Sequence, residues 1–260
     1  MLDAAPSAAE VIPHGPTVFR RGNEWLATLD GRETVRIPAE LAENIAFALR
    51  VQEKVDEALM SGTRPGFLKT IRMMNCRKTI AAVRGTRSLR DLIRSTKSAN
   101  PTREEQEEMS GIPELLDDVE RIGALGRTPV LGTSKEMHLK EYFDEHPTDF
   151  PAIVHIFNIP EKHEPAVLSR MVAGKALTRN EYRSGLRRDH TFLVLGRTES
   201  GKYLCFQKQG SDIHHRFELQ ALDSILHRAA DDESRTYLSV VGPVVANSEA
   251  QNAPAEQAVV

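Results

Sequence analysis

Apolar residues change their spacing at Pro38. Before it, the segment TVFRRGNEWLATLDGRETVRIP alternates apolar and polar residues, with an Asn and an Asp-Gly pair as turn signals, which is typical of a small strand-turn-strand unit. After it, apolar residues recur about one helical turn apart until Ser61-Gly62, at Leu41, Ile45, Leu49, Val55 and Leu59. This spacing predicts a helix that turns one face to the core.

The C-terminal third has the short apolar runs of a β-sheet. The runs are HTFLVLG, KYLCFQKQG, HRFEL and RTYLSVVGPVV, with RTESG as a turn after the first and a helical stretch, QALDSILHRA, before the last. They predict an antiparallel meander covered by one helix. The middle of the chain adds a helix around KEMHLKEYFDEH, a strand AIVHIFNI and a short helix around AVLSRMVAG. With helices mainly in the first half and strands in the second, the predicted class is α+β.

Length and composition fit one domain between two loose ends. The chain has 260 residues, 40% of them hydrophobic, which is enough for a substantial core. The start is rich in Ala and Pro, and the last stretch mixes small and polar residues without periodicity. We therefore expect flexible ends over residues 1–15 and 246–260, and a single domain over residues 16–245.

Charge, cysteine content and hydropathy narrow the class of protein. A net charge of −3 lacks the basic excess of a dedicated nucleic-acid binder. Two cysteines are too few for a disulfide framework or a four-thiolate zinc site, which favours a reducing, cytoplasmic setting. The first residues lack the basic and apolar regions of a Sec signal, and no run of about 18 apolar residues predicts a membrane span. The sequence leaves export by a specialised machinery open.

One segment, Arg64 to Lys97, is strongly basic and is opposed only by Asp91. Spaced Arg residues of this kind could bind an anionic partner, possibly a nucleic acid, although Phe67 is the only aromatic residue there to stack on a base. The acidic stretch REEQEEMSGIPELLDDVE follows directly. We favour the interpretation that the two stretches face one another or are solvated.

Candidate chemistry centres on Cys76. Asn75 is a good N-cap, so the cysteine is expected at the first position of a short helix that Gly85 ends. At a helix N-terminus the partial positive charge of unpaired N–H groups favours the thiolate, and Arg72, Arg77 and Lys78 act in the same direction. A backbone N–H in that first turn could also hold a developing oxyanion, as acyl transfer requires.

A cysteine nucleophile needs a base and an acceptor that orients the base. His190 opens the strand HTFLVLG, and if RTESG is the hairpin loop, the residue across from it is Gln207 or Gln209. Directly paired residues share a face of the sheet. We favour Gln207 because it lies inside its strand. Cys205 has only apolar neighbours and no helix terminus to ionise it, so we expect it to be a core residue.

These residues resemble the papain-like cysteine hydrolase superfamily, in its compact bacterial forms. The resemblance rests on "NC" opening a helix and, later, on HTFLVLGRTESGKYLCFQKQG. It implies a papain-like α+β fold with N-terminal helices on a C-terminal antiparallel sheet. It also implies catalytic roles for Cys76, His190 and Gln207, in that chain order, in a peptidase, an amidase or an acyltransferase.

Other chemistries find less support. The adjacent His214 and His215 would point to opposite faces of a strand, so we expect no metal site there. GRTESGKY departs from a phosphate-binding loop because Tyr203 follows the lysine and begins a strand, so we expect no nucleotide or other cofactor. The alternative to an enzyme is a papain-like domain without activity that binds an anionic partner through residues 64–97. The charged Arg77 after the cysteine and the amide at the third position are consistent with it.

Overall fold

The computed structural model describes residues 15–63, 71, 74–84, 135–159, 161–173, 187–209, 216–228 and 235–243. Several stretches lie outside these residues, namely the two ends expected to be flexible, apart from Gly15, the acidic stretch, and His214 and His215. So does the basic segment, apart from residues 71 and 74–84. The expectations about an anionic partner and about the domain boundaries 16–245 therefore stay predictions.

The first described elements form a small antiparallel sheet of three strands, where the sequence predicted two. They are β1 (Thr17–Arg21), β2 (Glu24–Thr28) and β3 (Thr34–Ile37), in that spatial order. Gly22, at a φ of +58°, takes the left-handed turn that joins β1 to β2. In the loop before β3, the Asp30 carboxylate accepts from the backbone N–H of Arg32 at 2.9 Å. The Asp-Gly pair is thus a turn between strands, as predicted.

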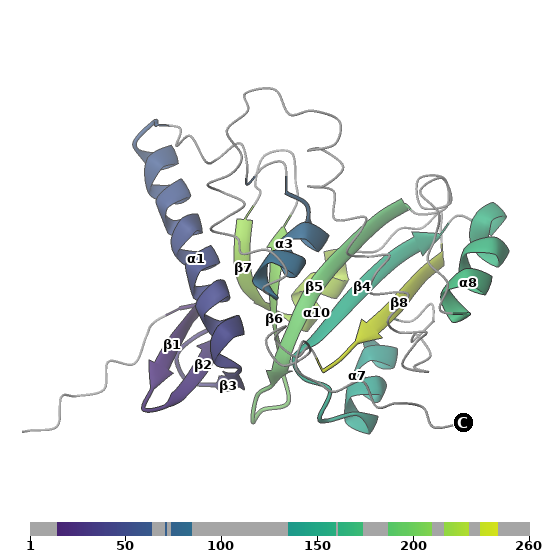
Figure 1. Cartoon of the computed structure of the whole chain (residues 1–260), viewed down its shortest axis with the longest axis horizontal. Coiled ribbons are helices and arrows are strands. Elements are labelled where there is room, and N and C mark those ends of the chain that lie inside the picture. The colour runs from purple at the N-terminus through teal and green to yellow at the C-terminus, as the bar shows by residue number, and fades with distance from the viewer. Residues whose placement is uncertain are drawn as a thin grey trace, which may run out of the picture.

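The predicted helix is α1 (Ala39–Met60), and Gly62, at a φ of +73°, follows its end. Its buried face carries Leu41, Ile45, Val51 and Val55, which confirms the core-facing stripe. Leu59 is a correction, because it is 46% exposed. The last turn of α1 extends past the strands on which the rest of the helix packs (Figure 1), so the apolar periodicity there has nothing described beneath it.

The larger sheet has five antiparallel strands in the order β7-β6-β5-β4-β8. Their bounds are β4 (Ala152–Ile159), β5 (Arg187–Arg197), β6 (Tyr203–Gln209), β7 (Arg216–Ala221) and β8 (Arg235–Val241). The meander prediction is right for β5, β6 and β7. It is wrong for β8, which pairs with β4 at the opposite edge. In the chain, helix α10 (Leu222–Arg228) follows β7 and precedes β8. Strand β8 then pairs with the edge of β4 instead of β7 (Figure 1).

Helices cover both faces of this sheet (Figure 1), which confirms the α+β class. One face carries Leu193, Leu195, Leu204 and Phe206 and packs on α1 and on α3 (Cys76–Val83). The other face carries Phe192, Val194 and Cys205 and packs on α7 (Lys135–Glu145) and α10. The remaining described helices are η1 (Glu161–His163) and α8 (Glu164–Val172). Because both faces are buried, β5 and β6 read as nearly continuous apolar runs.

Gly196 joins the two sheets at close range. Its φ is +158°, and a Cβ at this position would lie 2.5 Å from Cγ1 of Val35 on β3. Val35 is buried in the same core as α1 and α3. A side chain at residue 196 would therefore push β3 away from β5.

We expect Gly196→Ala to lower the free energy of unfolding by about 1–3 kcal/mol, because the added methyl overpacks the joint between the sheets. Urea denaturation of the variant measures the loss. Val35→Ala makes room for the methyl, so the double variant should lose less than the sum of the two single losses. Strict additivity would show that the two positions do not press on one another.

Candidate active site

The residue before α3 caps the helix and so sets the position of Cys76. The Asn75 backbone is extended, and its side-chain oxygen accepts from the N–H of Lys78 at 2.9 Å. The Thr79 hydroxyl donates to the Asn75 carbonyl, also at 2.9 Å. These contacts confirm Asn75 as the N-cap and Cys76 as the first helical residue. The predicted terminator, Gly85, lies outside the described residues, and the helix ends at Val83 with Arg84 as its C-cap.

The buried residues of α3 hold its first turn, which contains Cys76, in place. Every residue from Arg77 to Val83 is buried. Ile80, Ala82 and Val83 belong to the same core as Leu193 and Phe206 of the sheet. Cys76 alone in the helix is partly exposed. The helix lies on β5 and β6 (Figure 1), so the thiol is held at its opening turn while the rest of the helix is immobilised by the core.

Gln207 contacts His190, as predicted, but the strand register differs from direct pairing. The ladder between β5 and β6 pairs Leu193 with Phe206 and has an irregularity between Val194 and Gly196. Continued from Leu193 back to His190, this register places Gln209 across from His190 and Gln207 on the diagonal. Diagonal neighbours share a face and lie within reach of long side chains. The Gln207 side-chain oxygen lies 2.7 Å from Nε2 of His190.

The Cys76 thiol and the His190 side chain shift one another's pKa, both through hydrogen bonding and through charge. With the Gln207 oxygen at Nε2, Nδ1 is the ring nitrogen that remains available to the thiol. Burial alone would raise the pKa of Cys76. The hydrogen bond and the charge of His190 outweigh it, with smaller contributions from the Arg77 charge and the Thr191 backbone N–H, and bring the pKa of Cys76 down to about 6.

His190 shifts in the complementary direction. Burial tends to lower the pKa of its imidazole, but the hydrogen bond to Cys76 and the thiolate charge outweigh burial. The hydrogen bond to Gln207 and the charge of Glu218 add to them, so the pKa of His190 is raised from its ordinary value. A thiol with a lowered pKa beside an imidazole with a raised pKa favours the thiolate–imidazolium form of the pair.

No protein-family model, curated protein or solved structure matches this chain. The interpretation of the site therefore rests on its own geometry.

The sequence interpretation missed two groups that the structure brings to this site. Lys208 is 1% exposed, its ammonium donates to the carbonyl of Met74, and burial lowers its pKa to about 8. Strand alternation could have indicated that Lys208 is buried, because it lies on the same face of β6 as the apolar Leu204 and Phe206. Glu218 on β7 pairs with Gln207 in the register and accepts a hydrogen bond from it, which only the three-strand register could have indicated.

The second cysteine has the properties of a core residue, as expected. Cys205 is fully buried among apolar side chains between the sheet, α7 and α10. Burial, with the charge of Asp223, raises its pKa well above the ordinary value. Its thiol therefore stays protonated at neutral pH and contrasts with that of Cys76.

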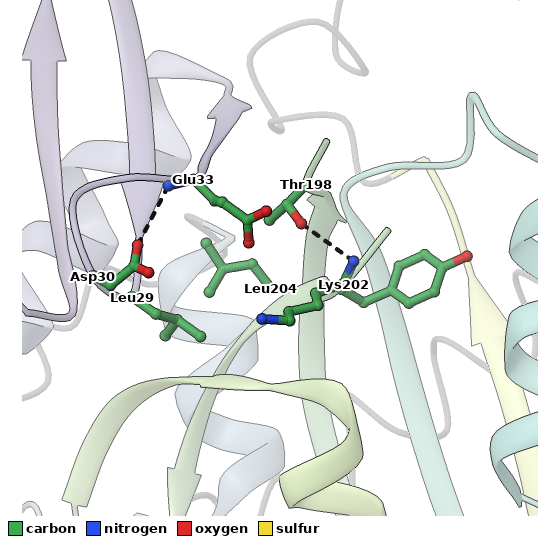
Figure 2. Close-up of a pocket in the computed structure, with 7 residues that line it drawn as sticks. Leu29, Asp30, Glu33, Thr198, Lys202 and Leu204 are labelled. Carbon is green, nitrogen blue, oxygen red and sulfur yellow. Dashed lines mark hydrogen bonds between the residues drawn. The ribbon is translucent and has the colours of Figure 1, made fainter. Parts of the chain in front are cut away.

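A pocket lies at the other end of β5 and β6, between the small sheet and the hairpin. Leu29, Asp30 and Glu33 line one side, and four hairpin residues line the other, namely Thr198, Lys202, Tyr203 and Leu204 (Figure 2). The distance from His190 to Thr198 along the strand is roughly 25 Å at the usual rise per residue. The Asp30 carboxylate accepts from the backbone of Glu33 at 3.3 Å, and the Thr198 hydroxyl accepts from that of Lys202 at 3.2 Å. We interpret this pocket as part of the joint between the sheets.

Two further features concern metals and membranes. Across the part of the chain that the structure describes, no three His, Cys, Asp or Glu side chains gather closely enough to hold a metal ion. Among the same residues, no helix has both the length and the apolar character needed to cross a bilayer.

We expect Asn75→Ala to lower the free energy of unfolding by about 1 kcal/mol, because the N–H of Lys78 loses its cap. Asn75→Asp keeps an acceptor and should retain stability, but it places a negative charge beside the thiol and should raise the pKa of Cys76. Urea denaturation measures the first effect, and the pH dependence of thiol alkylation measures the second. Equal thiol titrations in the parent and Asn75→Asp would show that the cap and the thiol do not interact.

Proposed function

We propose that this protein is a cysteine hydrolase of papain-like build, which cleaves amide or thioester bonds or transfers the acyl group. The observation that carries the proposal is Cys76 at a helix start with a pKa lowered to about 6 by His190, whose Nε2 lies 2.7 Å from the Gln207 side-chain oxygen. A cysteine that merely fills a core has its pKa raised, as Cys205 does.

The mechanism begins with the thiolate. The sulfur of Cys76 attacks the substrate's carbonyl carbon, and the carbonyl electrons move onto the oxygen. The N–H of Lys78 already donates to the Asn75 side chain. We therefore assign the backbone N–H of Cys76 as the donor to that oxyanion. When the tetrahedral intermediate collapses, the imidazolium of His190 gives its proton to the leaving amine or thiolate, and an acyl-thioester on Cys76 remains.

The second half returns the enzyme to its starting state. Neutral His190 removes a proton from water, or from the acceptor in a transfer reaction, as that nucleophile attacks the thioester carbonyl. The thioester bond breaks, the carboxylic acid or the new acyl product leaves, and Cys76 departs as thiolate beside the imidazolium. Throughout, Gln207 accepts from Nε2, so the other ring nitrogen faces the sulfur.

The pH range of the reactive form follows from the two shifts. As the pH rises, Cys76 loses its proton near pH 6, and the reactive pair is then present. It persists until His190 loses its proton, which occurs above the ordinary histidine value because the pKa of His190 is raised. We therefore expect a bell-shaped rate profile whose lower limb lies near pH 6.

Thiol alkylation tests the assembled pair without a substrate. We expect iodoacetamide to label Cys76 with a pH midpoint near 6, and His190→Ala to move the midpoint toward the free-cysteine value of about 8.5. Mass spectrometry of the labelled peptides follows each cysteine separately. Cys205 is the internal control and should label slowly at every pH at which the protein stays folded. A Cys76 midpoint near 8.5 that ignores His190 would refute the proposal.

Acyl-enzyme formation tests the reaction itself. We expect the protein, mixed with a panel of acyl thioesters and peptide amides, to gain the mass of one acyl group on Cys76. The adduct should be absent in Cys76→Ala. Gln207→Ala should slow its formation by about 10-fold or more, because the imidazole loses its orienting acceptor. A low Cys76 pKa with no adduct from any member of the panel would favour the papain-like domain without activity.

A further inference from the structure

Gln207 is held from behind by two acceptors on the neighbouring strand. Its side-chain nitrogen donates to Oε1 of Glu218 at 2.8 Å and to Oε1 of Gln220 at 3.1 Å. Glu218 pairs directly with Gln207 in the register of β6 and β7. Gln220 lies two residues further along β7, on the same face. A primary amide has two N–H protons, so these contacts use both of them.

The direction of the amide matters because its two ends make opposite demands on His190. With the oxygen toward Nε2, the ring must carry its proton on Nε2, and Nδ1 is left to face the thiol. With the amide reversed, its N–H group would meet Nε2 and favour a proton on Nδ1, where it would block proton transfer from Cys76. The reversed amide would also point its oxygen at the carboxylate of Glu218, which can only accept.

We propose that Glu218 is a positioning residue for the candidate active site, which locks the Gln207 amide so that its oxygen faces His190 and thereby holds the imidazole in its productive tautomer. The inference rests on the function proposed above and extends the site by one residue, to the series Cys76, His190, Gln207, Glu218. Gln220 completes the lock as a neutral second acceptor.

The charged groups around His190 support a role for this carboxylate. Helix α3 contributes Cys76, whose charge interacts with Arg77 of the same helix and with Lys208 of β6. Strand β4 places the uncharged Ile156 opposite His190. Among the described groups that raise the pKa of His190, Glu218 contributes the one negative charge besides the thiolate. A carboxylate behind a neutral amide therefore favours the imidazolium without contacting it.

The test removes the thiol and observes the imidazole directly. In a Cys76→Ala background, with ¹⁵N-labelled histidine, NMR reports the pKa of His190 and the ring nitrogen that carries the proton; His190→Gln assigns the signal. We expect Glu218→Gln to lower the pKa of His190 by about half a unit or more and to reduce the share of the Nε2–H tautomer. Glu199→Gln removes the same charge from the exposed hairpin turn and should change neither value.

A double-variant cycle separates the amide lock from a simple field effect. In a Gln207→Met background the link between Glu218 and the ring is broken, so Glu218→Gln should no longer change the tautomer. An equal effect with and without Gln207 would overturn the proposal, as would parental values in folded Glu218→Gln. If Glu218→Gln does not fold, Glu218→Asp shortens the side chain and keeps the charge, and it must still reduce the Nε2–H share. Because no thiol or substrate is present, this result is independent of the alkylation result.

Discussion

The candidate site depends on the packing of one short helix against two strands. Helix α3 has eight residues, and such a helix is marginal in isolation. Its buried face meets Leu193 of β5 and Phe206 of β6, and the carbonyl just before its cap accepts from buried Lys208. These contacts hold the first turn against the start of β5. Cys76 and His190 are 114 positions apart in the sequence. These contacts are what bring the thiol and the imidazole ring together.

Packing at this depth creates an electrostatic problem that the neighbouring groups resolve. Removing a thiolate from water raises its pKa, and removing an imidazolium from water lowers its pKa. Each group reverses the effect of burial on the other. A pair of this kind is stable only if the partners stay in contact, because a lone charge at the same place loses the attraction that offsets its desolvation. The rigid placement of α3 and the capture of His190 by Gln207 therefore serve one purpose, which is to keep the two charges together.

Local signals in the sequence were enough to predict the positions of several residues of this candidate site. Asn75 before Cys76 predicted a capped helix because a cap is a matter of neighbouring residues, and His190 and Gln207 followed from a hairpin whose turn was readable. The sequence could not give the position of β8, since the choice between two free sheet edges depends on which one the rest of the fold leaves open. Lys208 and Glu218 were missed for a related reason. Their roles depend on contacts with α3 and across β6 and β7, and a polar residue in a strand otherwise reads as solvent-facing.

The order of groups behind His190 explains why an amide can stand where a carboxylate would also orient the ring. A carboxylate in direct contact with Nε2 would bind the imidazolium strongly and share its proton. With Gln207 between them, Glu218 sets the direction of the hydrogen bond and adds a weaker stabilisation of the positive ring. In the proposed reaction the imidazolium then stays paired with the thiolate, yet its proton on the sulfur side remains available to a leaving group. The neutral amide thus separates the two tasks of orienting the histidine and tuning its charge, and β6 and β7 each supply the residue for one of them.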